Sequence, residues 1–135
     1  MNLDLMAAQQ AQEIVKKTKG GGEDASGLDN TVTKTLGVLQ EDGVYAAFLF
    51  LLSRTDKEKK RAKIVREEML ELLGGMGFAW DGSKPEKAED VLSYITKKVT
   101  GGVGAEALER LMLAKETLEQ MLIYARYGAK AWGQE

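Results

Sequence analysis

The residues best suited to do chemistry in this chain are cations, and six of them fall close together. They are Lys57, Lys59, Lys60, Arg61, Lys63 and Arg66. Lys59, Lys63 and Arg66 follow one another at i, i+4 and i+7, so they share one face of a helix. They occupy the first half of that helix, where the macrodipole disfavours positive charge. We interpret this row either as a solvated charged face or as a surface that contacts the phosphates of a nucleic acid.

Two further groups of basic residues could serve the same purpose. IYARYGAKAW, at 123–132, combines Tyr124 and Tyr127 with Arg126 and Lys130, which lie one helical turn apart. These tyrosines could stack beside the cations, or they could simply pack at the edge of the core while the cations are solvated. Nearer the N-terminus, lysines at a helix end suit the dipole and could also reach a phosphate backbone. The candidate nucleic-acid-binding residues are therefore Lys16, Lys17, Lys59, Lys63, Arg66, Arg126 and Lys130.

The residue types that are missing exclude most catalytic chemistry. The chain contains no histidine and no cysteine, which excludes thiol nucleophiles, Ser-His triads, His general bases and zinc sites built on those ligands. Carboxylate di-metal sites in helical bundles use Glu-x-x-His pairs, and none is present. We therefore predict no catalytic residue, no metal and no cofactor, and we expect that the protein is not an enzyme.

Two glycine-containing segments are reminiscent of nucleotide-binding loops, but neither meets the requirements of the motif. GVGAEA at 102–107 reads G-x-G-x-x-A, but the dinucleotide fingerprint needs a preceding strand and a βαβ unit. We expect helices on both sides, so we interpret the segment as a helix-to-helix turn. GGGEDASG at 20–27 lacks G-x-x-x-x-G-K-[ST]. We interpret it as a flexible connector that extends over about residues 20–30.

The composition is typical of a small globular protein with one domain. With 135 residues, 44% apolar and 30% charged, the chain fits one domain over residues 1–135. The net charge of -2 argues against a protein that coats nucleic acid unaided, although a local basic surface is compatible with it. The first residues lack the basic start and apolar run of a signal peptide. Together with the absence of cysteine, this leads us to expect a cytoplasmic protein.

The run from Val44 to Leu52 organises the expected fold. Its nine residues, VYAAFLFLL, are all apolar, and a helix that is apolar on every side must be surrounded by protein or lipid. A bilayer span needs about 20 such residues, and this run is closed by Ser53 and Arg54. We therefore predict a buried central helix over 44–52.

Helical spacing of apolar residues predicts an all-α fold, a single compact bundle of about six helices. The first helix should run from about Leu3 to Lys19, and the second should be capped by Asn30 or Thr31. A capping box at 55–58 should open the fourth helix, which left-handed glycines at 74–75 should end. A second box at 83–86 should open the fifth helix, whose end near Val99 has a strand as a minor alternative.

The last helix should be the longest, over about 105–132. Its apolar residues recur at alternating steps of three and four, as in a heptad seam with one polar member. The members of this seam are Leu108, Leu111, Lys115, Leu118, Leu122, Ala125, Ala129 and Trp132.

Two of these segments together resemble a known family. LGVLQEDGVYAAFLFLLSR, at 36–54, and LMLAKETLEQMLIYARYGAKAW, at 111–132, are similar to the small subunit of the Cmr complex. That complex is the type III-B CRISPR effector, an RNA-guided assembly that cuts target RNA. Family members are small all-helical proteins with a helix, a Gly-containing break and a very apolar helix, and they end in a long helix with a Tyr/Arg/Lys pattern. Residues 20–30 and 74–102 do not contribute to the resemblance.

The resemblance implies a non-catalytic subunit whose copies stack head to tail along the guide-bound backbone. Its partners would be other Cmr subunits, further copies of itself, and the duplex of guide RNA and target RNA, which it would contact through phosphates. It implies no membrane and no small-molecule substrate. The alternative function is a helical protein-interaction adaptor with no nucleic-acid role, whose long C-terminal seam docks a partner helix.

Overall fold

Six α-helices and one π-helical turn form the structure, a computed structural model that describes residues 1–135 and contains no strand. The predicted all-α fold class is confirmed, as is the number of helices. None of the helices combines the length and the apolar character that crossing a membrane requires. In chain order the elements are α1 (Leu3–Gly20), α2 (Ala25–Asp42), α3 (Val44–Leu52), α4 (Asp56–Gly75), α5 (Ala88–Tyr94), η1 (Ile95–Val99) and α6 (Ala105–Gly133).

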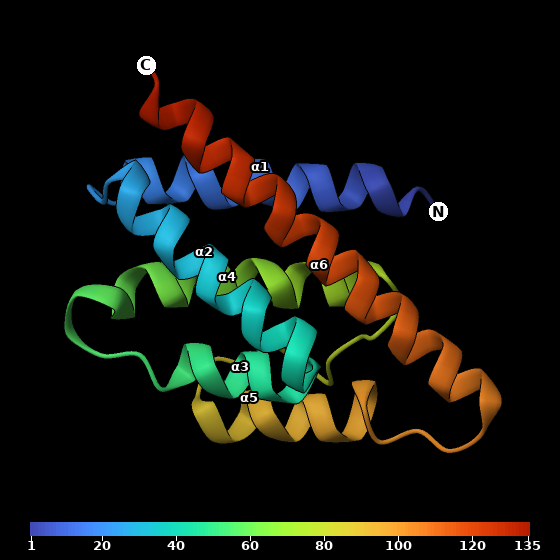
Figure 1. The fold of residues 1–135 in the computed structure, drawn as a ribbon. Helices are drawn as coiled ribbons and strands as arrows, with labels where there is room; N and C mark the ends of the chain where they lie inside the picture. The colour runs from blue at the N-terminus through green and yellow to red at the C-terminus, as the bar shows by residue number, and fades with distance from the viewer.

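The longest helix, α6, lies diagonally across α1 and α2 (Figure 1). Behind it, α4 packs against α1 and α3, and α5 closes the lower end of the molecule beside α3. Each helix turns one apolar stripe inward, and the stripes meet in one continuous core. Its largest fully buried side chains come from every α-helix except the short α5 and include Ile14, Leu28, Phe48, Met69 and Leu118.

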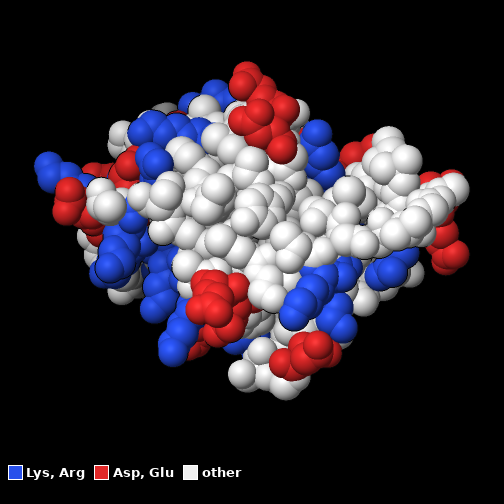
Figure 2. Space-filling view, turned by 90° about the horizontal axis from the view of Figure 1, so that it is seen from below, with Lys and Arg blue, Asp and Glu red and all other residues white.

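Helix α3 is buried on one face only, which corrects the expectation that protein surrounds it. Phe48 and Leu51 lie in the core, whereas Tyr45 is 38% and Leu49 is 47% exposed. The helix lies at the lower edge of the fold, with α5 as its neighbour (Figure 1). The middle of this lower face is uncharged, and charged side chains gather around its rim (Figure 2). An apolar run therefore identified the helix correctly but did not show how deeply it is buried.

The connection between α1 and α2 is short, so the predicted extent of the connector, about residues 20–30, is wrong. Gly20 ends α1, and α2 already begins at Ala25, where the Asp24 carboxylate accepts a hydrogen bond from the Gly27 amide at 2.6 Å. Asn30 and Thr31 thus lie inside α2 and do not cap it. Two side chains of α4 reach the connection: Lys60 donates to the Gly21 carbonyl, and Arg61 pairs with Glu23 at 2.9 Å.

Neither of the two predicted capping boxes forms. Thr55 precedes α4, but its side chain makes no capping hydrogen bond, and Asp56 adopts a left-handed φ of 50°. Glu58, the expected partner of Thr55, instead pairs with Lys34 at 3.0 Å and with Arg54 at 3.5 Å. The second box fails because α5 begins only at Ala88, beyond the segment 83–86.

The ends of α4 and α5 also differ from the sequence-based expectation. Helix α4 continues through Gly75, and the left-handed glycine that follows is Gly77, with φ +98°. After α5 the chain is neither α-helix nor strand, because Ile95–Val99 forms a π-helical turn. The amide and the hydroxyl of Thr100 both donate to the Ile95 carbonyl, at 2.9 and 3.3 Å.

Helix α6 divides into a packed half and a projecting half. Its second half buries Leu118, Leu122, Ala125 and Ala129, so that part of the predicted seam is confirmed. Its first turns extend beyond the neighbouring helices (Figure 1) and leave Leu108 58% exposed. The segment before it, 100–104, is a turn between two helical elements, as predicted.

Candidate nucleic-acid interface

The exposed face of α4 carries cations that have no acidic partner. Lys59 and Lys63 are one turn apart, and both are exposed. The structure contains nine ion pairs, and neither lysine takes part in any of them. The same is true of Lys57, at the beginning of the helix. These side chains remain in water, and no carboxylate lies within ion-pair distance of them.

Arg66 continues this face one turn further along α4, at the edge of the core. Its guanidinium is partly buried, and its Nε has no hydrogen-bond partner. Burial lowers the pKa of Arg66 from its usual value, and the charges of Glu67 and Glu86 oppose that shift. An arginine stays protonated in either case, so Arg66 adds a fixed charge beside the two lysines, while its Nε is buried and out of reach of a ligand.

The two other basic residues of this stretch have structural roles. Lys60 and Arg61 hold the connection between α1 and α2, and Arg61 also donates from Nε to the Thr31 hydroxyl at 3.2 Å. Of the six cations between 57 and 66, these two bind other groups of the protein and are not free to bind a ligand. We define the basic row as Lys59, Lys63 and Arg66, which share one face of α4; Lys57 lies on the other side of the helix.

On α1, two adjacent lysines have opposite environments. Lys17 donates to Glu68 of α4 at 2.7 Å, and the Glu68 side chain is only 2% exposed. That hydrogen bond raises the pKa of Lys17 above its usual value, and burial opposes the increase. Lys17 thus neutralises a buried carboxylate and is held by it. Lys16 is exposed and forms no ion pair, so it remains available.

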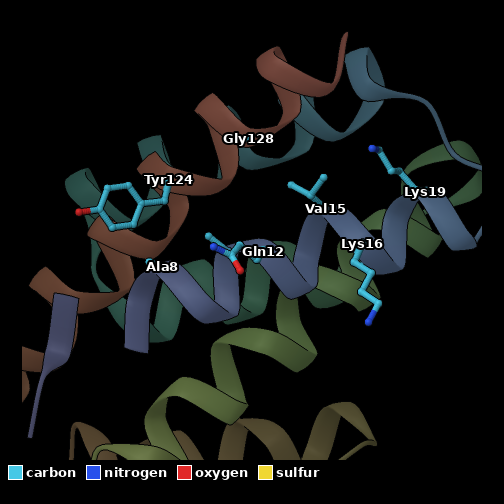
Figure 3. Close-up of a pocket in the computed structure, with 8 residues that line it drawn as sticks. Ala8, Gln12, Val15, Lys16, Lys19, Tyr124 and Gly128 are labelled. Carbon is cyan, nitrogen blue, oxygen red and sulfur yellow. The ribbon is translucent and has the colours of Figure 1, made fainter. Parts of the chain in front are cut away.

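Lys16 also lines a groove between α1 and α6 (Figure 3). The groove has a volume of about 490 Å³ and an apolar floor of small side chains. Lys16 and Lys19 lie at one end and Tyr124 lies at the other. Lys19 is engaged, since it pairs with Glu135 at 3.0 Å and lies over the Trp132 ring at 5.4 Å. The remaining lining residues are Ala8, Ala11, Gln12, Val15 and Gly128.

The C-terminal candidates are held by one carboxylate of α2. Asp29 lies 3.1 Å from Lys130 Nζ and 3.8 Å from Arg126 Nε. Tyr127 is 64% exposed beside them, whereas Tyr124 donates its hydroxyl to Asp4. This hydrogen bond raises the pKa of Tyr124. Arg126 and Lys130 would have to leave Asp29, at least in part, before they could contact a phosphate.

Sequence reasoning identified the cations but missed the carboxylates that hold several of them. Glu68 lies 51 residues from Lys17, and Asp29 lies 101 residues from Lys130. No local spacing indicates such contacts, because they depend on how α1, α2, α4 and α6 pack. Lys16 and Tyr124, which belong to separate groups in the sequence, line the same groove but lie at its opposite ends. It contains no cluster of three or more carboxylates that could hold a metal ion.

Comparisons with known proteins do not assign the chain to a family. No family model, no curated protein and no solved structure matches the chain. The functional argument therefore depends on the residues themselves and on the two segments quoted above.

Proposed function

We propose that this chain is a non-catalytic, cytoplasmic small subunit of the type III-B CRISPR Cmr effector complex, in which it contacts target RNA through phosphates. The basic row on α4 is the observation that carries the proposal. Two of its three members, Lys59 and Lys63, are exposed lysines without an ion pair, in a chain whose net charge is -2. No carboxylate of the protein neutralises these lysines, so they are free to pair with a ligand that supplies negative charge.

The arrangement of α2, α3 and α6 supports the same proposal. The resemblance implies a helix, a Gly-containing break and a very apolar helix, followed later by a long terminal helix. In this chain α2 ends at Asp42, Gly43 has φ +96°, and α3 begins at Val44. The second matched segment lies entirely within α6.

The chemistry of such a contact is simple. Lysines attract phosphate oxygens by charge and read no base, so binding is independent of sequence and weakens as salt increases. One copy offers few contacts, so affinity grows when copies align along an RNA backbone beside the other Cmr subunits. RNA cleavage belongs to another subunit in this proposal, and the isolated chain should show no nuclease activity.

The test uses a reconstituted complex with Lys59→Gln/Lys63→Gln. Each lost phosphate contact should lower the slope of log affinity against log salt by about 0.7–0.9. Lys87→Gln/Lys115→Gln is the matched control, because it removes the same charge from two lysines that lie outside α4 and form no ion pair. Equal slopes for the two variants, in complexes that assemble normally, would show that the basic row is only a solvated surface.

One observation favours the adaptor as a second candidate function. The projecting half of α6 exposes Leu108, Met112 and Leu113 by 58, 54 and 46%, and exposed apolar side chains at helical spacing are typical of partner-binding helices. The packed half of the seam is occupied by α1 and α2, so only the projecting half could dock a partner. Genes for the other Cmr subunits beside this one would favour the first function.

A further inference from the structure

Two adjoining clefts lie around the irregular connection between α4 and α5, and no residue of the basic row lines either of them. This connection covers residues 76–87, and connections of such length without regular structure are often functional. The clefts have volumes of about 440 and 410 Å³, within the range of small-molecule sites. Asp81, Lys97 and Lys98 line both of them and form their shared wall.

The 410 Å³ cleft is the more positive of the two. Its cations are Lys97, Lys98 and Arg110, and Asp81 is its only carboxylate. Lys98 already pairs with Asp81 at 3.4 Å, whereas Lys97 is exposed and has no ion pair. The Arg110 guanidinium lies over the Phe78 ring at 4.7 Å, which orients it. This cleft thus favours an anion.

The π-helical turn explains how the two lysines come to line the cleft. Lys97 and Lys98 lie in the turn Ile95–Val99, and π-turns in proteins are rare and frequently found at functional sites. Gly101 lies two residues after the turn, and a Cβ at this position would collide with the Thr96 carbonyl oxygen. Only glycine fits this position without displacing the turn that holds the lysines.

The 440 Å³ cleft has a different chemistry. Its four lysines are balanced by Asp81, Glu86 and Asp90, and one of them, Lys84, also pairs with Glu71 at 2.8 Å. Its wall includes the half-buried indole of Trp80, which meets the Tyr94 ring edge-on at 6.3 Å. A Cβ at Gly74 would lie 2.7 Å from this indole, so the glycine allows Trp80 to pack directly on α4. An uncharged planar group suits this cleft better than a second anion does.

We propose that the two clefts together bind one nucleotide, with its phosphate at Lys97, Lys98 and Arg110 and its base against Trp80. Cations that converge on a phosphate and an aromatic ring for the base are the usual elements of such recognition. The nucleotide can be free or can be an unpaired residue of an RNA strand, since both present the same chemistry. The site shares no residue with the basic row, so it stands or falls independently of the function proposed above.

The test is fluorescence titration of the full chain with adenosine 5′-monophosphate. The chain has two tryptophans, so a Trp132→Phe background leaves Trp80 as the only indole, and its melting curve checks folding. We expect saturable quenching, with adenosine and inorganic phosphate each binding at least about tenfold more weakly, because either lacks half of the contacts. Lys97→Gln/Lys98→Gln should weaken binding of the nucleotide by at least about tenfold. Lys59→Gln/Lys63→Gln is the matched control and should leave it unchanged.

A second titration distinguishes the two sources of the nucleotide. Tighter quenching by a short single-stranded oligoadenylate than by the mononucleotide supports an RNA strand, and equal or weaker quenching supports a free nucleotide. Absence of quenching by either probe at millimolar concentration would overturn the proposal. So would nucleotide binding that is unaffected in Lys97→Gln/Lys98→Gln, or inorganic phosphate that binds as tightly as the nucleotide.

Discussion

Replacing Lys17 by methionine should destabilise the fold far more than its exposed position suggests. The substitution removes the ammonium that lies 2.7 Å from Glu68, whose side chain is 2% exposed. Removing one partner of a buried ion pair costs about 3–5 kcal/mol, because the other charge is left uncompensated. Lys17 is itself 49% exposed, so water can reach its side of the pair. We therefore expect about 3 kcal/mol, the lower end of that range.

Urea denaturation followed by circular dichroism measures this loss. With a slope of about 1–3 kcal/mol per molar urea, the midpoint should fall by about 1–3 M. Lys16→Met is the matched control, since Lys16 is exposed and unpaired, and it should change stability by less than about 0.5 kcal/mol. Lys17→Met/Glu68→Met should recover most of the loss, because the buried charge is then gone.

The pH dependence gives a separate check on the same pair. The hydrogen bond to Glu68 raises the pKa of Lys17 above 10.5, so the folded state holds this proton more tightly than the unfolded state. The stabilisation is therefore present below pH 10.5 and lost as the pH rises through the raised pKa. The difference between wild-type protein and Lys17→Met should shrink in that direction. Equal urea midpoints for Lys17→Met and Lys16→Met at neutral pH would refute the reasoning.

Three further predictions follow from burial and backbone geometry. Phe48→Asp should unfold the protein, because Phe48 is 0% exposed and an unpaired buried charge costs several kcal/mol. Leu49→Asp is the control: this position is 47% exposed, so circular dichroism should show a folded protein that melts cooperatively. Burial raises the pKa of Tyr94 from 10.0 to about 12, so wild-type stability should fall between about pH 10 and 12, and Tyr94→Phe should flatten that fall in urea titrations. Gly101→Ala should lower the melting temperature, because the added Cβ would collide with the Thr96 carbonyl. Gly37→Ala should stabilise the folded protein by about 0.5–1 kcal/mol, because Gly37 lies within α2 and its Cβ would meet no neighbouring atom.

Periodicity in the sequence was sufficient to predict the helices but not their ends. The apolar spacing in α1 and in the second half of α6 reports which face is buried, because each helix meets the core along one stripe. Capping is decided by competition between side chains. Glu58 binds Lys34 and Arg54 instead of Thr55, and Asp24 begins α2 earlier than Asn30 or Thr31 would.

The candidate interface was predictable only in part. Spacing alone placed Lys59, Lys63 and Arg66 on one face of a helix, and they do follow one another along α4. It could not show that Lys17 is paired to Glu68, because that contact joins two helices far apart in the chain. The lysines of the π-helical turn were missed for another reason, since Lys97 and Lys98 gain their position from a backbone conformation that has no simple sequence signature.

The position of α6 across α1 and α2 has a consequence for the order in which the chain can fold during synthesis. The core faces of α1 and α2 are completed by Leu118, Met121, Leu122 and Ala125, which leave the ribosome after every other helix. Until then, the side chains of Ile14 and Leu28 have no cover from α6. The nascent chain therefore exposes the apolar surface of its first two helices for most of its translation, and such surface is prone to aggregation and chaperone binding.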